Sequence, residues 1–426
     1  MAIIGILLAT PAVPPVSAQE PGRRLSAAVF GAPDPRLADD PPEATLSATG
    51  LLFGAYDDSL FLDQRAGTLL PPSRSRGSHL GFGGTLLYER AGDQSVRASL
   101  SGTNFYHLGT HRLTPGHLAA DVSSSSVMPL WRGARLRSSG MAHYAQYGVP
   151  FVAAASFVGR FPADMFYGDD DIHLRRTDVL RGQAQLEQDW GARKSVGVIA
   201  SVQTSGLEGS GRAEGYELGG LFSNRFGRNG TLRAGYTLQE IDYGGGATYL
   251  IHHLNLGGNY GRPLSATRRV YLSFSGGSTV LESLGQARLQ AVGDATLQYE
   301  IGRTWRGSAR YRRGVVFVDE IAGPLLSDGF SAEIDGLLSR RLELRGSGSF
   351  TRGTAGLSRD AAPPYDMYLA RTQARYALSR VAAIYAEYLF FKYRFAESVQ
   401  LGGALPSYYD RHTVRAGVTV LTQLLR

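Results

Sequence analysis

The sequence contains no cysteine and almost no lysine, and both absences restrict its chemistry. Without cysteine, disulfide bonds and thiolate metal sites are excluded, although an oxidising compartment remains allowed. Of the 44 basic residues only Lys194 and Lys392 are lysines, so arginine supplies nearly all of the positive charge. Arginine offers planar, bidentate hydrogen bonding to carboxylate, sulfate or phosphate groups.

Long hydrophobic runs are also missing. Beyond the N-terminus, no uncharged apolar stretch reaches the ~18 residues that a membrane-spanning helix needs. The 426 residues include 54 Gly, 22 Tyr and 18 Phe, whereas only 19% are charged. This mixture favours many strands with glycine-relieved bends and aromatic belts, and it fits helical bundles poorly. A membrane protein of this composition would have to be a β-barrel.

The N-terminus has the pattern of a secretory signal. An apolar run over residues 3–8 is followed by Val16-Ser17-Ala18, a small-residue cleavage site. Three prolines at 11, 14 and 15 argue against the alternative of a short buried helix. We therefore predict a signal peptide over 1–18, a flexible periplasmic segment over 19–44, rich in Pro, Asp, Ala and Arg, and a barrel over 45–426.

Short turns and longer polar stretches alternate along the rest of the chain. The tight turns are predicted near 90–93, 130–133, 191–193, 226–230, 263–267, 302–303, 338–341 and 378–380. Longer connections are predicted near 55–77, 104–116, 147–176, 206–213, 243–248, 280–286, 316–327, 352–365 and 396–408. Eight turns and nine loops connect eighteen strands, and an even number places both termini on the same side, the periplasm. A soluble propeller or sandwich has no reason to alternate loop lengths so regularly.

Within the predicted strands, apolar and polar residues alternate with period two. In 287–300, Leu289 and Leu297 share one face, whereas Arg288 and Asp294 share the other. A sandwich would show the same alternation, but it would not usually need strands of 10–14 residues. The sequence predicts an all-β fold: a transmembrane, antiparallel, up-and-down β-barrel of about 18 strands in the outer membrane of a Gram-negative bacterium, in contact with its lipid.

Charged residues fall on the polar faces, which we assign to the lumen because a charge facing lipid costs about 2–4 kcal/mol at the midplane. The predicted pore-lining arginines are Arg97, Arg135, Arg137, Arg181, Arg233, Arg288, Arg306, Arg310, Arg312, Arg345, Arg371, Arg375 and Arg415. The acids on the same faces are Asp121, Glu187, Glu217, Asp294, Glu300, Glu333, Asp335, Glu343 and Glu387. Each arginine taken singly is best explained by pairing across strands, but the surplus of arginine predicts a lumen that favours anions.

The longest predicted connection, 147–176, carries an apolar segment over 151–158 and then acids. That order resembles the third loop of general porins, which folds into the barrel and sets acids against a basic wall. The resemblance implies a constriction loop with Asp164, Asp169, Asp170 and Asp171 near the arginines. The acidic run could equally bind calcium or be solvated.

The sequence gives little support for catalysis. It lacks G-x-S-x-G, H-E-x-x-H and Walker-type glycine motifs, and the neighbouring His252 and His253 face opposite sides of one strand. Glu333 and Asp335 lie on one face without an implied cleft, so cross-strand pairing explains them better than acid–base chemistry. We expect no enzyme, no cofactor, no metal site and no nucleic-acid partner.

The segment 377–388, Ala-Leu-Ser-Arg-Val-Ala-Ala-Ile-Tyr-Ala-Glu-Tyr, combines a Ser-Arg turn with an Ala/Tyr-rich strand. This habit resembles the broad group of outer-membrane barrel porins that often accompany exopolysaccharide secretion. The strand number and the arginine-rich lumen are similar to those of alginate-type export porins. One departure is the end of the chain at Leu425-Arg426, because such barrels usually end on an aromatic residue.

The resemblance implies a conduit for a secreted, anionic polysaccharide, with a periplasmic export protein as a partner. The alternatives are a general diffusion or anion-selective porin for small solutes, and a closed structural or adhesion barrel.

Overall fold

A computed structural model describes the chain from residue 44 to residue 425 with gaps. The described ranges are 44–61, 74–90, 94–109, 111–147, 175–207, 212–227, 229–242, 248–265, 268–283, 286–301, 304–317, 324–355, 364–395 and 408–425. The predicted signal peptide, the segment 19–43 and most of the predicted constriction loop lie outside these ranges, so those predictions remain untested.

Eighteen β-strands account for nearly all of the described residues. They are β1 (Ala44–Phe61), β2 (Arg74–Arg90), β3 (Gln94–His107), β4 (Arg112–Trp131), β5 (Ala134–Tyr147), β6 (Arg175–Trp190), β7 (Lys194–Leu207), β8 (Arg212–Phe226), β9 (Gly230–Asp242), β10 (Thr248–Ser265), β11 (Arg268–Ser283), β12 (Gln286–Ile301), β13 (Trp305–Phe317), β14 (Pro324–Leu337), β15 (Leu342–Ala355), β16 (Pro364–Ala377), β17 (Ala382–Phe395) and β18 (Tyr408–Leu425). In this part of the chain we find no helix that is long and apolar enough to cross a membrane.

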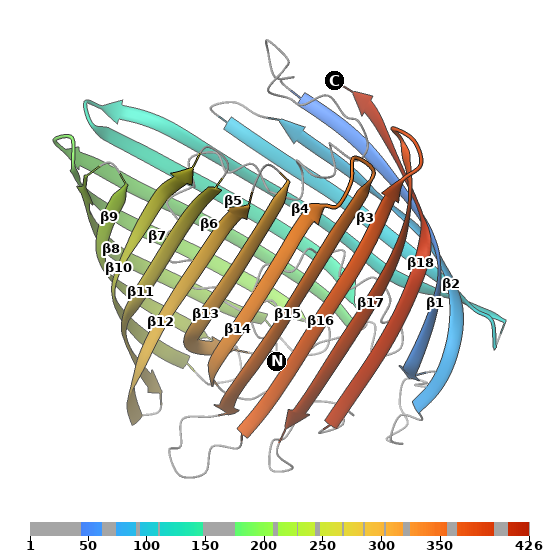
Figure 1. Cartoon of the computed structure of the whole chain (residues 1–426). Coiled ribbons are helices and arrows are strands. Elements are labelled where there is room, and N and C mark those ends of the chain that lie inside the picture. Colours follow the sequence, from blue (N-terminus) through green and yellow to red (C-terminus); the bar gives the residue numbers. More distant parts are fainter. Residues whose placement is uncertain are drawn as a thin grey trace.

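The strands form one closed antiparallel wall (Figure 1). Each strand pairs with its neighbours in the chain, and β1 pairs with β18, for example Phe53 with Gly417 and Ala55 with Arg415. Closure leaves no edge strand with unpaired backbone groups, which is the condition for placing a sheet in a membrane. The predicted eighteen-stranded, up-and-down barrel is confirmed.

The connections at the two ends of the barrel differ. At one end of the barrel lie eight short turns. The start of β1 and the end of β18 lie at the same end, since Ala44 pairs with Arg90 and Leu46 with Leu425. Two of these turns share the tripeptide Leu-Ser-Arg, and the Ser379 hydroxyl accepts hydrogen bonds from the N–H groups of Val381 and Ala382. Such side-chain bonding to the backbone favours a tight turn. All eight predicted turns lie where strands end.

The other end is less regular than predicted. The expected loop 104–116 reduces to 108–111, because β3 and β4 continue to pair through Phe105 and Thr114. The expected loop 280–286 reduces to 284–285. Above the apolar layer both faces of a strand are polar, so the period-two pattern fades although backbone pairing continues. The strands reach 13 to 20 residues: nine lie within the predicted 10–14, and nine are longer.

Side chains alternate between two environments along each strand. On β1, Phe53 is 2% exposed and Leu52 is 59% exposed; on β10, His253 is buried while Leu254 and Leu256 are exposed. Because side chains converge on the concave side of a closed wall, the less exposed face is the inner one. The outer face carries large apolar side chains in strand after strand, as lipid contact requires.

Candidate functional site: the charged inner wall

All thirteen predicted arginines lie on the inner face of the barrel. The ladder shows this directly for one row of paired residues, which runs through Arg306, Asp335, Arg345, Gln373, Glu387 and Arg415 on β13 to β18. The same alternation places the remaining arginines on this face, together with the nine predicted acids. Whether the arginines line a conducting pore remains a prediction.

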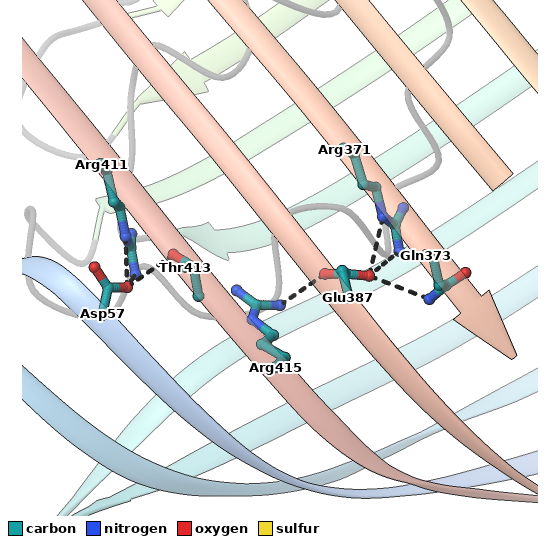
Figure 2. A network of polar contacts seen from close by, with 7 residues as sticks. All are labelled: Asp57, Arg371, Gln373, Glu387, Arg411, Thr413 and Arg415. Atoms are coloured by element: carbon teal, nitrogen blue, oxygen red, sulfur yellow. Dashed lines mark hydrogen bonds and ion pairs between the residues drawn. The ribbon is translucent and has the colours of Figure 1, made fainter.

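A buried polar network joins β16, β17 and β18 (Figure 2). Glu387 lies at its centre and accepts hydrogen bonds at Oε2 from Arg371 Nε at 3.0 Å and Nη2 at 2.5 Å. Gln373 Nε2 donates to the same oxygen at 3.1 Å, and Arg415 Nη1 lies 3.8 Å from Oε1. The Arg371 and Glu387 side chains are each 3% exposed. One carboxylate thus compensates two buried guanidinium groups.

A second network crosses the seam where β18 meets β1. Asp57 Oδ2 accepts hydrogen bonds from Arg411 Nε at 2.6 Å, from Arg411 Nη2 and from Thr413 Oγ1 at 3.0 Å. Sequence reasoning missed both charged members. It placed Asp57 in a connection beginning at residue 55 and left Arg411 out, although Asp57 continues the inward alternation of Phe53 and Ala55.

Ion pairs also occur on the inner face of β2, β3, β5 and β6. Arg135 Nη2 lies 3.2 Å from Asp189 Oδ2, and Arg137 Nη2 lies 3.4 Å from Glu187 Oε2. Arg97 Nε lies 3.7 Å from Glu89 Oε1, and this acid, like Asp189, was absent from the predicted set. The pairing interpretation therefore holds for many of the arginines taken singly, and it extends further than the sequence indicated.

Some inward arginines also contact neutral groups. Arg233 Nη2 donates to Asn259 Oδ1 at 2.8 Å, and Arg375 Nη2 donates to Thr419 Oγ1 at 3.4 Å. Arg181 and Arg288 lie opposite Gln203 and Leu281 in the ladder.

Among the described strands, β13 carries the most arginines on its inner face. It carries Arg306, Arg310 and Arg312 within seven residues; Arg306 lies 3.8 Å from Glu300, and Arg312 is opposite Asp294. Arg310 lies between Thr296 and Ser331. Among the described residues it has no carboxylate within ion-pair distance, and its buried Nε has no hydrogen-bond partner. Arg310 is thus a cation that the described wall does not neutralise.

The four acids of the predicted constriction loop, Asp164, Asp169, Asp170 and Asp171, lie outside the described residues. Their approach to the arginine-bearing wall remains a prediction. Within the described part of the chain, no group of three or more His, Asp or Glu side chains is arranged to hold a metal ion.

No protein-family model and no curated protein matches this chain. Solved structures with similar shapes include Pseudomonas aeruginosa OpdL, with 13% identity over 91% of this chain and 100% of that chain and a TM-score of 0.41. Pseudomonas aeruginosa OpdQ has 11% identity over 89% of this chain and 98% of its own, with a TM-score of 0.43. Acinetobacter baumannii OccAB3 has 10% identity over 90% and 100%, with a TM-score of 0.42.

Likenesses this weak carry no argument about what the chain transports. None of the three proteins is named as a polysaccharide exporter, and the resemblance to alginate-type exporters remains an expectation from the sequence. The assignment of the fold rests on the closed ladder of eighteen strands itself.

Proposed function

We propose that the chain is an outer-membrane channel through which small anionic solutes diffuse. The observation that carries this proposal is the row of three arginines, Arg306, Arg310 and Arg312, on the inner face of β13. Arg310 has no carboxylate partner among the described residues. In a water-filled pore surrounded by a low-dielectric wall, such a charge raises the local concentration of anions.

The architecture supports the membrane location and the open lumen. Outer-membrane barrels have even strand numbers, short periplasmic turns and longer extracellular loops, and an eighteen-stranded wall is wide enough for an aqueous channel. By this rule the end with the eight short turns, which also holds Ala44 and Leu425, faces the periplasm. The longer connections then face the cell exterior.

The charge distribution favours small anions over a polymer. A moving polysaccharide needs many weak contacts along the height of the pore, since one tight site would stall it. On β16 to β18, however, Arg371, Arg411 and Arg415 are buried and bound to carboxylates. The polysaccharide conduit indicated by the sequence resemblance is therefore the weaker hypothesis, and the small-anion channel requires no periplasmic export protein.

Reversal potentials in planar bilayers under a KCl gradient test the proposal. The double variant R310Q/R312Q should lose at least half of the chloride-over-potassium preference of the unmodified chain. The matched control R340Q/R341Q removes the same charge from the exposed turn between β14 and β15 and should leave selectivity unchanged. Equal selectivity in all three proteins would refute the anion channel, and a correctly assembled barrel without conductance would favour a closed structural barrel.

A further inference from the structure

The outer face of β13 to β16 carries a row of alternating charges near the end that bears the longer connections. Arg313, Asp328, Arg352 and Asp366 are successive partners in the ladder, and Arg394 on β17 follows them. Arg313 Nη1 contacts both carboxylate oxygens of Asp328 at 3.3 and 3.2 Å, which completes one ion pair. Asp366, Arg352 and Arg394 do not form a simple pair, because one carboxylate serves two arginines.

Asp366 is shared by two arginines. Arg394 Nη2 lies 3.1 Å from Asp366 Oδ2, and Arg352 Nε lies 3.6 Å from Oδ1. The Asp366 side chain is 17% exposed, whereas those of Arg352 and Arg394 are 70% and 69% exposed. A guanidinium group has five N–H donors, so one shared carboxylate leaves most donors of both arginines facing outward. The pair carries a net positive charge.

A third cation lies one row closer to the centre of the membrane. Lys392 is the ladder partner of Tyr368, and its Nζ lies 5.6 Å from the centre of the Tyr408 ring. Asp410, which is opposite Lys392, accepts a hydrogen bond from the Tyr408 hydroxyl at 2.9 Å. Arg352, Lys392 and Arg394 together are named here the outer basic cluster.

Aromatic rings and small side chains continue the surface below the cluster. The Phe350 and Tyr368 rings pack 4.9 Å apart, as expected for an aromatic belt at the membrane interface. The next outward positions on β15 and β16 are Gly348, Gly346, Ala370 and Thr372, which form a strip of small side chains. Such a strip allows an acyl chain to lie close to the sheet.

Three described acidic side chains lie at the same level on the other side of the barrel. The outward positions at the ends of β8 and β9 are Glu214, Glu240 and Asp242, and the Tyr216 hydroxyl donates to Glu214 Oε2 at 3.0 Å. These acids repel phosphate, so they disfavour an anionic headgroup at this position.

We infer that the outer basic cluster binds the phosphate groups of a phosphorylated glycolipid of the outer leaflet, whose acyl chains cover the small-residue strip. The inference rests on the orientation proposed above, which places this end at the cell surface. The cluster spans β15 to β17, roughly 10 Å at ordinary strand spacing. That width suits a headgroup with two phosphates better than a single phosphodiester. Charge-assisted bonds from exposed arginines to phosphate are strong enough to select it.

Native mass spectrometry of the full chain in detergent micelles containing diphosphorylated lipid A tests the inference. The unmodified barrel should retain one lipid A molecule, and R352Q/R394Q should retain about tenfold less, because charge-assisted hydrogen bonds are lost. R340Q/R341Q, with the same charge change at the opposite end, should bind like the unmodified barrel. Dephosphorylated lipid A and phosphatidylglycerol should compete poorly.

Equal retention by R352Q/R394Q and the unmodified barrel would overturn the inference, and so would equal competition by either of the other lipids. Both variants should keep the mobility shift of a folded barrel in cold SDS, which shows that any loss of lipid is not a loss of fold. Bilayer selectivity is measured on the same samples: unchanged anion preference with lost lipid binding supports the lipid site, whereas an inactive channel that still binds lipid refutes only the proposed function.

Discussion

Asp57 and Arg411 lie 354 positions apart in the chain and form a buried ion pair across the seam between β1 and β18. Asp57 is fully buried, and Thr413 donates a third hydrogen bond to the same oxygen. The peptide N–H of His412 also donates to the carboxylate of Asp58, at 2.7 Å. The first and last strands are therefore joined by charged side chains as well as by the backbone ladder.

Removing the acid from this seam should destabilise the closed barrel. Asp57→Asn takes from the buried Arg411 the carboxylate that accepts hydrogen bonds from its Nε and Nη2, which costs on the order of 3–5 kcal/mol. Urea unfolding in detergent, followed by tryptophan fluorescence, should give a lower midpoint for D57N. The double variant D57N/R411Q should recover part of that loss, because the buried guanidinium group is removed together with the carboxylate. A midpoint for D57N equal to that of the unmodified chain would show that the pair does not hold the seam.

Two adjacent glycines on β11 should differ sharply in their tolerance of a methyl group. A Cβ on Gly277 would meet the backbone of Leu254 and Asn255 on β10, whereas a Cβ on Gly276 would meet nothing within 4 Å. Backbone cannot move aside as a flexible side chain does, so Gly277→Ala should lower stability by roughly 1–3 kcal/mol. Gly276→Ala should be close to neutral. Similar heat-modification temperatures for the two variants would contradict this account.

The absence of cysteine permits a clean test of orientation. Gly109→Cys places a thiol in the connection between β3 and β4, and Arg380→Cys places one in the exposed turn between β16 and β17. We expect a maleimide coupled to a polymer too large to pass through the barrel to label G109C on intact cells and R380C only after lysis, because short turns face the periplasm. The reverse pattern would place the short turns, together with Ala44 and Leu425, at the cell surface. The lipid inference would then lose its basis.

The sequence predicted the strand number and the inward faces because one simple pattern determines both. Where a strand crosses the apolar layer, as in 287–300, lipid on one side and water on the other enforce alternation. The ends of strands could not be predicted, because beyond that layer both faces are polar. Asp57 was assigned to a loop for this reason: it follows the apolar part of β1, yet strand pairing continues to Asp57.

The pairing of inner charges depends on register, which a single sequence does not specify. Arg371 and Glu387 meet because β16 and β17 place Arg371 opposite Leu389, one inward position away from Glu387. A shift of two residues would preserve every face and change every partner. The sequence could therefore predict which arginines face inward but not which of them are neutralised, and Arg310 could not be distinguished from Arg371.

The balance of charge around Glu387 gives the sharpest test of the function. Glu387→Gln removes the carboxylate that compensates Arg371 and Arg415, so the wall becomes more positive. We expect the chloride-over-potassium permeability ratio to rise about twofold, opposite in direction to the effect of R310Q/R312Q. The neutral double variant R371Q/E387Q removes one charge of each sign and should restore a ratio close to that of the unmodified chain. If E387Q assembles correctly and its reversal potential does not move, Glu387 and its arginines do not border the ion path, and the proposed role of the inner wall is wrong.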